Sequence, residues 1–156
     1  MRIIAASDIH GRGSNFFDIV EMHIDDADIF ISLGDCNNGN DLDNAKLYFG
    51  KRLLLKEVCG NCDFSSTEPA EDLITVSGKR VLFCHGHLYG VKHGYSMLFE
   101  RAKEKGADIA LFGHTHTPFY EYRDNIHLFN PGSVANSEYG IIDITPSGIM
   151  CINAKL

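Results

Sequence analysis

Residues 1–11 read MRIIAASDIHG, and this stretch shows the pattern that decides the fold. The β-branched and small apolar residues over 2–7 predict a buried strand. Asp8 and His10 follow at once, in a loop that also contains Gly11. An apolar run that ends in metal-binding side-chain types then recurs along the sequence.

The order of these runs indicates the fold class. Strands are expected at residues 2–7, 28–33, 52–59, 73–76, 80–84, 108–112, 120–123, 126–129, 139–144 and 149–153. Helices are expected from Ser14 (a capping residue type) onward, over 44–50 after a polar turn at 38–43, and over 95–105 before Gly106. The βαβαβ start and the largely antiparallel second half predict an α/β protein with two packed, mixed sheets and helices outside.

The composition limits the classes of function. The 156 residues suit one domain spanning 1–156, and 44% apolar with 22% charged residues is typical of a globular protein. The formal net charge of −7 argues against a basic surface for nucleic-acid polymers or membranes. The N-terminal apolar stretch is too short for a signal peptide, so we expect a cytoplasmic protein with five reduced cysteines.

Polar residues of metal-binding types follow five of the apolar runs. The carboxyl ends of parallel strands line one edge of an α/β sheet, and ligands bind in the crevice there. The residues that this rule brings together are Asp8, His10, Asp35, Asn61, His85, His114 and His116. Their nitrogen and oxygen donors suit Mn, Fe, Ni, Co or Zn. Seven donors are too many for one tetrahedral zinc, and they suit two metals that share a carboxylate.

Six short motifs follow one another along the chain: DIHG (8–11), GD (34–35), GNCD (60–63), HGH (85–87), GHTH (113–116) and NPGSV (130–134). This ordered set resembles the calcineurin-like metallophosphoesterases, most closely their small bacterial and archaeal phosphodiesterase branch. The resemblance implies a four-layer αββα sandwich with a dinuclear centre of divalent ions. Mn²⁺ is expected there, with Ni²⁺, Fe²⁺, Co²⁺ or Zn²⁺ as alternatives. By the same resemblance, Asp8, His10 and His116 would hold one metal, Asn61, His85 and His114 the other, and Asp35 would bridge them.

The pair Cys59 and Cys62 allows three interpretations. A structural zinc site lacks the second C-x-x-C pair that it needs. A thioredoxin-like redox motif should open a helix, which lowers the pKa of the thiol, whereas Cys59 is expected to close a strand. We therefore interpret Asn61 as the metal ligand of this segment and Cys59 as a small buried apolar residue.

Cys62 departs from many larger relatives, in which the motif reads GNHE or GNHD. That histidine is regarded in the family as the general acid for the leaving group. An unperturbed thiol has a pKa of about 8.5, against about 6.5 for imidazole, and is therefore a poorer acid at neutral pH. We expect weak activity on monoesters with poor leaving groups and a preference for diesters or activated esters.

The expected function is a metal-dependent phosphoesterase that hydrolyses small phosphodiesters or activated phosphate esters by attack of a metal-bound hydroxide. Cys62 and His87 are candidate catalytic residues, and Arg12 and Ser133 are candidate contacts to the substrate phosphate. The expected partner is a small phosphate ester, and homo-oligomerisation is left open. The alternative is a non-catalytic protein-interaction scaffold, because a retromer subunit shares this fold and acts chiefly through protein contacts.

Overall fold

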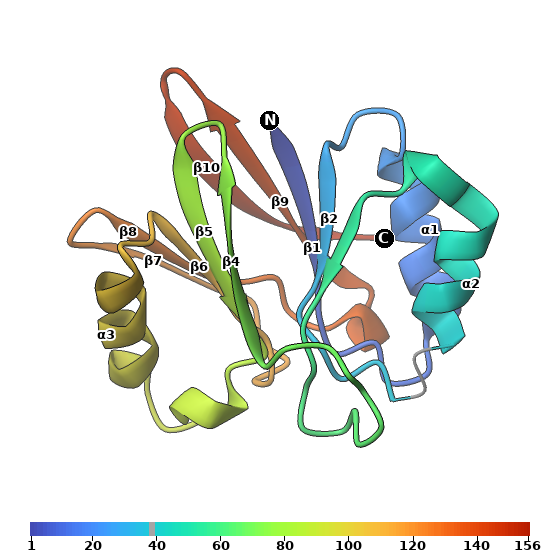
Figure 1. The fold of residues 1–156 in the computed structure, drawn as a ribbon, viewed down its shortest axis with the longest axis horizontal. Coiled ribbons are helices and arrows are strands. Elements are labelled where there is room, and N and C mark those ends of the chain that lie inside the picture. The colour runs from blue at the N-terminus through green and yellow to red at the C-terminus, as the bar shows by residue number, and fades with distance from the viewer. Residues whose placement is uncertain (38–39) are drawn as a thin grey trace.

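The computed structural model describes residues 1–37 and 40–156 and contains two five-stranded β-sheets (Figure 1). The first sheet has the strand order β10-β9-β1-β2-β3. Its strands are β1 (Arg2–Ala6), β2 (Ile29–Ser32), β3 (Leu55–Glu57), β9 (Glu138–Thr145) and β10 (Gly148–Lys155). Strands β1, β2 and β3 run parallel to one another, and β9 and β10 are antiparallel to their neighbours.

The second sheet has the strand order β4-β5-β6-β8-β7. Its strands are β4 (Glu71–Val76), β5 (Lys79–Cys84), β6 (Ile109–Leu111), β7 (Phe119–Arg123) and β8 (Ile126–Asn130). Strands β5, β6 and β8 are parallel, while β4–β5 and β7–β8 are antiparallel hairpins. Both residues of each hairpin turn have positive φ, at Ser77-Gly78 and at Asp124-Asn125, as two-residue turns that match the strand twist require.

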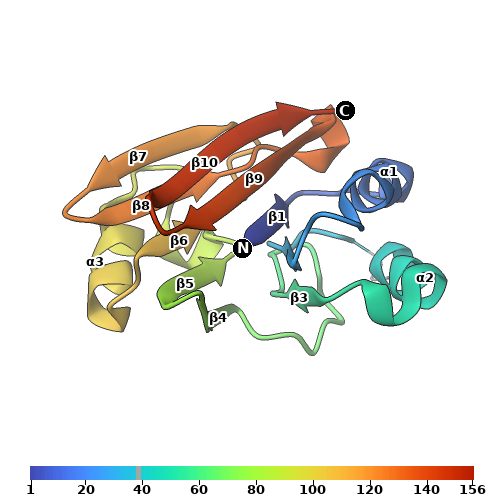
Figure 2. The same cartoon turned by 90° about the horizontal axis from the view of Figure 1, so that it is seen from above.

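Helices cover the outer face of each sheet. Figures 1 and 2 show α1 (Gly13–His23) and α2 (Asn40–Phe49) on the first sheet and α3 (Ser96–Lys105) on the second. Short 3-10 turns lie at Gly50–Arg52, His87–Tyr89 and Val134–Asn136. This arrangement confirms the expected four-layer αββα class. Among the described residues, no helix combines the length and the apolar character needed to cross a bilayer.

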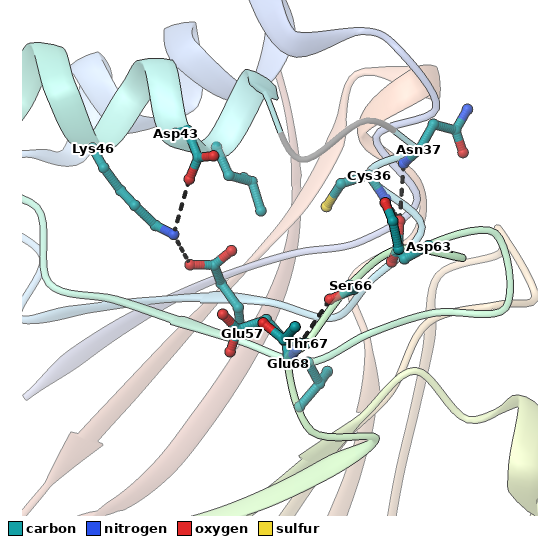
Figure 3. A pocket seen from close by; sticks show the side chains of 12 residues that line it. Cys36, Asn37, Asp43, Lys46, Glu57, Asp63, Ser66, Thr67 and Glu68 are labelled. Carbon is teal, nitrogen blue, oxygen red and sulfur yellow. Dashed lines mark hydrogen bonds and ion pairs between the residues drawn. The ribbon is translucent and has the colours of Figure 1, made fainter.

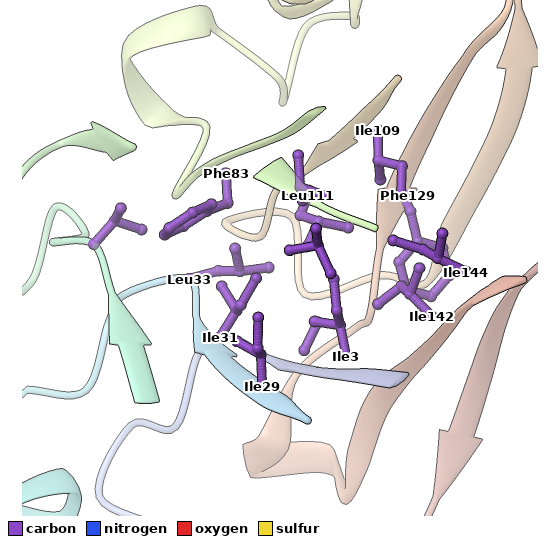
Figure 4. Close-up of a cluster of buried hydrophobic side chains, with 14 residues drawn as sticks. Ile3, Ile29, Ile31, Leu33, Phe83, Ile109, Leu111, Phe129, Ile142 and Ile144 are labelled. Atoms are coloured by element: carbon purple, nitrogen blue, oxygen red, sulfur yellow. The ribbon is translucent and has the colours of Figure 1, made fainter. Parts of the chain in front are cut away.

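The largest shared core lies between the two sheets (Figure 4). Its side chains include Ile3 and Ile31 from the first sheet and Phe83 and Leu111 from the second, all fully buried. Side chains of successive strand residues point to opposite faces, so Ile4 in β1 packs instead under the helices. Strands that are buried on both faces explain the nearly unbroken apolar runs in the sequence.

The starts of both N-terminal helices differ from the prediction. Helix α1 begins at Gly13 with Arg12 at its N-cap and no side-chain hydrogen bond there, so Ser14 lies inside the helix and does not cap it. Helix α2 begins at Asn40, earlier than the expected residue 44. Acidic side chains in its first turn favour this start, because they lie near the positive end of the helix dipole. Residues 38–39 of the predicted turn lie outside the described residues.

Strand β3 is shorter than the expected run over 52–59. Residues Gly50–Arg52 form a 3-10 turn instead, which is closed by a hydrogen bond from the Leu53 N–H to the Gly50 carbonyl at 3.2 Å. Cys59 follows β3 and is only partly buried, so the expectation of a buried apolar residue at this position is wrong.

Candidate metal centre

The carboxyl ends of the parallel strands bring the seven predicted ligand residues to one edge of the sandwich. Two groups of donor atoms can be distinguished, and within each group all donor atoms lie within 4.8 Å of one another. The first group is Asp8 with His10 and His116, and the second is Asp35 with His85 and His114. The Asn61 Oδ1 atom is 3.1 Å from Nε2 of His85, so it joins the second group. Each group contains the side-chain types that hold a divalent transition metal.

Asp8 is completely buried and carries one unpartnered oxygen. Its Oδ2 accepts hydrogen bonds from the Ser7 hydroxyl at 2.7 Å and from the His114 N–H at 3.0 Å. Its Oδ1 lies 3.1 Å from Nε2 of His116 but accepts no hydrogen bond from the described residues. A buried carboxylate oxygen without a partner is costly, and a bound cation would satisfy it.

Asp35 lies between the two groups. Its Oδ2 is 3.4 Å from Nε2 of His85 and 3.7 Å from Nε2 of His10, and its Oδ1 accepts the Cys62 N–H at 2.8 Å. Burial by itself would raise the pKa of Asp35, but hydrogen bonds from His85 and Cys62 outweigh burial and hold the pKa well below its ordinary value. The carboxylate is therefore ionised at neutral pH, the state in which it could bind a cation.

A hydrogen bond on the far side of the His85 imidazole orients this ring toward the centre. Nδ1 of His85 lies 2.8 Å from the Leu33 carbonyl and therefore carries a proton. Its Nε2 faces Asn61 Oδ1 and Nδ1 of His114, both at 3.1 Å, and Oδ2 of Asp35 at 3.4 Å. A bound cation would take the place of the proton that Nε2 shares with these atoms. Burial and the nearby His85 lower the pKa of His114 to about 4, so that ring is neutral. Three acceptor atoms that face one another fit a shared cation.

The main chain is strained at most of these positions. Positive φ angles occur at Asp8 (54°), His10 (43°), Asp35 (57°), His114 (67°) and His116 (57°). Non-glycine residues rarely adopt this left-handed conformation, and it clusters at functional sites where the surrounding structure enforces it. The conformation turns each side chain out of its strand direction and into the common space.

Two glycines allow the loops to approach one another closely. A β-carbon on Gly113 would lie 1.8 Å from the Ser7 hydroxyl oxygen, and one on Gly60 would lie 2.1 Å from Oδ1 of Asp35. Neither position can accept a side chain without displacing a residue of the centre. The glycines of the GNCD and GHTH motifs therefore serve close packing.

Sequence reasoning missed the role of Asp63. Its carboxylate accepts four main-chain N–H groups, from Asp35 at 2.7 Å, Cys36 at 2.8 Å, Asn37 at 3.0 Å and Gly60 at 2.8 Å. These bonds fasten the loop after β2 to the loop after β3. The only signal in the sequence was the position of Asp63 directly after Gly60-Asn61-Cys62.

Asn130 fastens a further pair of loops. Its amide donates to the Gly113 carbonyl at 2.9 Å and to the Thr115 hydroxyl at 3.1 Å, and its Oδ1 accepts the Gly132 N–H at 2.9 Å. Asn130 is fully buried. Asn130 ends β8 and Val134 begins a 3-10 turn, so the NPGSV segment connects these two elements, and its Asn130 supports the GHTH loop.

The four candidate catalytic and substrate-contact residues lie in different environments. Cys62 is partly buried and forms a third donor group with His10 and Asp35; burial and Asp35 raise the pKa of its thiol. The ring of His87 lies 5.4 Å from that of His85, and its Nδ1 is buried without a partner among the described residues. Arg12 is exposed where α1 begins.

Ser133 has a different place from the one that the sequence suggested. It is fully buried, and its hydroxyl donates to the Asp8 carbonyl at 2.9 Å. It therefore has no surface that a substrate phosphate could reach in this structure. Its hydrogen bond supports the strained main chain at Asp8.

A polar cavity of about 250 Å³ lies beside the centre (Figure 3). Asn37 and Asp63 line its side nearest the predicted ligands, and Lys46, which also lines the cavity, lies between Asp43 and Glu57. Four of its lining side chains are carboxylates (Asp43, Glu57, Asp63 and Glu68) and one is an amine. This excess of negative charge does not suit a phosphate group.

Known proteins match the chain over most of its length. Residues 1–145 match the family model of the calcineurin-like phosphoesterase superfamily domain. The chain is 32% identical to the probable metallophosphoesterase YsnB of Bacillus subtilis over 134 residues, which cover 86% of this chain and 75% of YsnB. It is 28% identical to the phosphodiesterase YfcE of Escherichia coli K12, with 98% of this chain and 93% of YfcE covered.

A solved structure shows the same fold. The predicted phosphoesterase from Streptococcus pneumoniae TIGR4 superposes with a TM-score of 0.78 at 21% identity, covering 98% of this chain and 97% of the other. The likeness of fold, the extent of the family match and the identity to YsnB agree with one another. The chain therefore belongs to the calcineurin-like phosphoesterase superfamily.

Proposed function

We propose that this protein is a dinuclear-metal phosphodiesterase that hydrolyses small phosphodiesters or activated phosphate esters. The proposal depends on one observation above all: two donor groups lie side by side, with Asp35 between them and an unpartnered buried oxygen on Asp8. Asp8, His10 and His116 would hold one divalent ion, and Asn61, His85 and His114 the other, with Asp35 shared. Mn²⁺ is the expected ion, and Ni²⁺, Fe²⁺, Co²⁺ or Zn²⁺ would also fit these donors.

The bound ions would supply Lewis acidity and a water molecule of lowered pKa. The protein side chains then have three tasks. Asp8 and Asp35 offset part of the metal charge and leave the centre positive, which suits a singly charged diester. His87, whose ring lies beside that of His85, and Arg12, two residues after His10, would donate hydrogen bonds to the phosphate oxygens as negative charge grows. The strained loops hold the donors in place before the substrate arrives.

Cys62 supports the choice of diesters over monoesters. Its thiol occupies the position that resembles the general-acid histidine of larger relatives, and burial with Asp35 raises its pKa. A group that holds its proton more tightly is a weaker acid toward a leaving group at neutral pH. Esters whose leaving groups need little protonation should therefore react best. The relative YfcE bears the name phosphodiesterase, which agrees with this preference.

The test is hydrolysis of bis-p-nitrophenyl phosphate by metal-free protein to which Mn²⁺ is returned. Activity should depend on Mn²⁺ and should disappear in Asp35→Asn and His85→Ala. His93→Ala is the matched control, because His93 is exposed and lies outside the centre. Full turnover in protein stripped with EDTA would refute the proposal. Metal analysis should find two ions per chain in the wild type.

The same assay separates the enzyme from the protein-interaction scaffold that shares the fold. A scaffold would show no metal-dependent turnover on any small ester, even when both donor groups bind metal. We further propose that the protein works in the cytoplasm, where reducing conditions preserve its five free thiols. A screen of cyclic nucleotides and small diesters would narrow the substrate.

A further inference from the structure

Strand β10 forms an unprotected edge of the first sheet. It pairs with β9 in continuous register over its whole length, from Gly148 opposite Thr145 to Lys155 opposite Glu138. Among the residues that the structure describes, no strand lies beyond it in the sheet order. Within the described part of the chain, main-chain groups of residues 149–155 hydrogen-bond only to β9. Such a row of unpaired N–H and C=O groups is a template for another strand.

The other three sheet edges carry the features that discourage such pairing. Strand β3 has only three residues, two of them charged, and β4 begins with Glu71 and Asp72. Strand β7 has five residues, with charges at Glu121 and Arg123. Strand β10 has eight residues, GIMCINAK, without proline and with no charge before Lys155. Short length and charge are the usual protections of an edge, and β10 has neither.

Both faces of β10 are apolar where it meets solvent. Ile149 and Cys151 pack against the core between the sheets. Met150 and Ile152 alternate with them and therefore point to the opposite face, where they are 54% and 40% exposed. Hence a strand placed beside β10 would find apolar partners on either face.

Two tyrosines of the second sheet lie along the same side of the sandwich. Tyr120 and Tyr122 pair with Phe129 and His127 in β8, and Phe129 belongs to the core between the sheets, so both tyrosines face the first sheet. They are nevertheless 47% and 56% exposed. Asn153 in β10 donates to the Asn130 carbonyl of β8 at 2.8 Å, and Figure 2 shows β7 and β10 along one side. A strand added to β10 would cover these rings.

We propose that a second copy of this chain binds at this edge, with β10 antiparallel to β10 of the other copy. The two five-stranded sheets would then form one continuous sheet. Antiparallel pairing of a strand with itself creates the twofold symmetry of most homodimers. Each copy carries a net charge of −7, so the long uncharged edge is the place where two copies meet with least repulsion.

The register centred on Cys151 suits this pairing best. It places Met150 of each copy opposite Ile152 of the other, so that the exposed apolar side chains cover one another. Lys155 then lies opposite Ser147, beyond the strand, and no like charges meet. Cys151 of one copy faces Cys151 of the other across the axis.

The first experiment measures mass in solution by size exclusion with light scattering. The wild type should have twice the mass of the 17.3 kDa chain. Met150→Lys and Ile152→Lys should be monomers, because each would place a lysine ammonium group opposite an apolar side chain of the partner strand. The matched control is Leu47→Lys, on α2 at 84% exposure, which should remain a dimer. A monomeric wild type, or β10 variants that stay dimeric, would overturn the proposal. Circular dichroism melts check that each variant is folded.

The second experiment tests the register by oxidation of the thiols with copper phenanthroline. Directly opposed β-carbons in an antiparallel pair lie about 4.5–5.5 Å apart, close to the spacing that a disulfide needs. The wild type should form a covalent dimer on a denaturing gel. Cys151→Ser should form none, yet should keep its dimeric mass. A dimer that does not cross-link through Cys151 contradicts the pairing. Hydrolase activity does not enter either readout, so this inference can fail independently of the proposed function.

Discussion

Gly113 lies against Ser7 so closely that a β-carbon on Gly113 would come within 1.8 Å of the Ser7 hydroxyl oxygen. The same β-carbon would be 2.9 Å from Oδ2 of Asp8. Ser7 follows β1 of the first sheet, and Gly113 follows β6 of the second. This contact therefore joins the two sheets at the edge where the candidate metal ligands lie.

Gly113→Ala should destabilise the protein and weaken its metal binding. Overpacking of a tight contact costs about 1–3 kcal/mol, and the displaced Ser7 and Asp8 would shift one candidate ligand. We expect a lower melting temperature and an affinity for Mn²⁺ that is reduced at least about tenfold, as measured by thermal melts and titration calorimetry.

Ser7→Ala is the control for the Gly113 variant. It removes the hydrogen bond to Oδ2 of Asp8 without adding an atom, so we expect a loss of only about 1 kcal/mol. Gly113→Ala protein that melts and binds Mn²⁺ like the wild type would show that the loops can separate freely.

Asp63→Asn should weaken metal binding although Asp63 is not a predicted ligand. The carboxylate accepts four main-chain N–H groups, and an amide offers only one oxygen and adds two donors. The loops that carry Asp35 and Asn61 would loosen. We expect the affinity for Mn²⁺ to fall about 10–100-fold in titration calorimetry.

Glu68→Gln provides the comparison for Asp63→Asn. Glu68 lies on the same loop and is exposed, so its loss of charge should leave the affinity near the wild-type value. Equal effects of the two substitutions would indicate that the net charge near the centre controls affinity and that the hydrogen bonds of Asp63 do not.

The convergence of the seven candidate ligand residues could be predicted because each one lies in a loop that follows an apolar run. Asp8 comes after β1, Asp35 after β2 and His85 after β5. Parallel strands that share a sheet end at the same edge, so sequence order alone indicated that these side chains meet. The hairpins were equally readable, because turns such as Asp124-Asn125 favour positive φ.

The supporting contacts could not be predicted because they depend on distances between loops. Ser133 is a residue type that is common in exposed turns, yet in the fold it is buried and its hydroxyl donates a hydrogen bond to the Asp8 carbonyl. The four hydrogen bonds of Asp63 require two loops to lie within 3 Å of each other, which no spacing in the sequence encodes. The start of α1 at Gly13 likewise lacks the side-chain cap that Ser14 suggested.

The stability of the protein in acid should depend on Glu71. Arg101 donates hydrogen bonds to its carboxylate, which is only partly exposed, and holds the pKa of Glu71 below its ordinary value of 4.5. A lowered carboxylate pKa stabilises the fold above the ordinary value, and this contribution is lost as pH falls through the folded-state pKa. Urea melts of Glu71→Gln should therefore show a weaker loss of stability below about pH 4.5 than the wild type.

Glu104→Gln is the matched variant for Glu71→Gln. Glu104 also pairs with Arg101, but its side chain is 66% exposed, and water screens such a pair. Glu104→Gln should therefore lose stability in acid to the same extent as the wild type. If Glu71→Gln also loses as much stability in acid as the wild type and Glu104→Gln, the ion pair between Glu71 and Arg101 contributes nothing to folding.

Cys62→His should raise activity on monoesters relative to diesters. The Cys62 N–H donates a hydrogen bond to Oδ1 of Asp35 at 2.8 Å, and the Cys62 side chain lies in one donor group with His10 and Asp35. We therefore expect an imidazole at this position to reach the leaving-group oxygen. Imidazole, with a pKa of about 6.5, is the better acid at neutral pH. The measurement is kcat/KM with p-nitrophenyl phosphate and bis-p-nitrophenyl phosphate in Mn²⁺. Cys62→Ser, which removes the thiol without supplying an acid, should leave the ratio low. An unchanged ratio in Cys62→His would remove Cys62 from the choice of substrate.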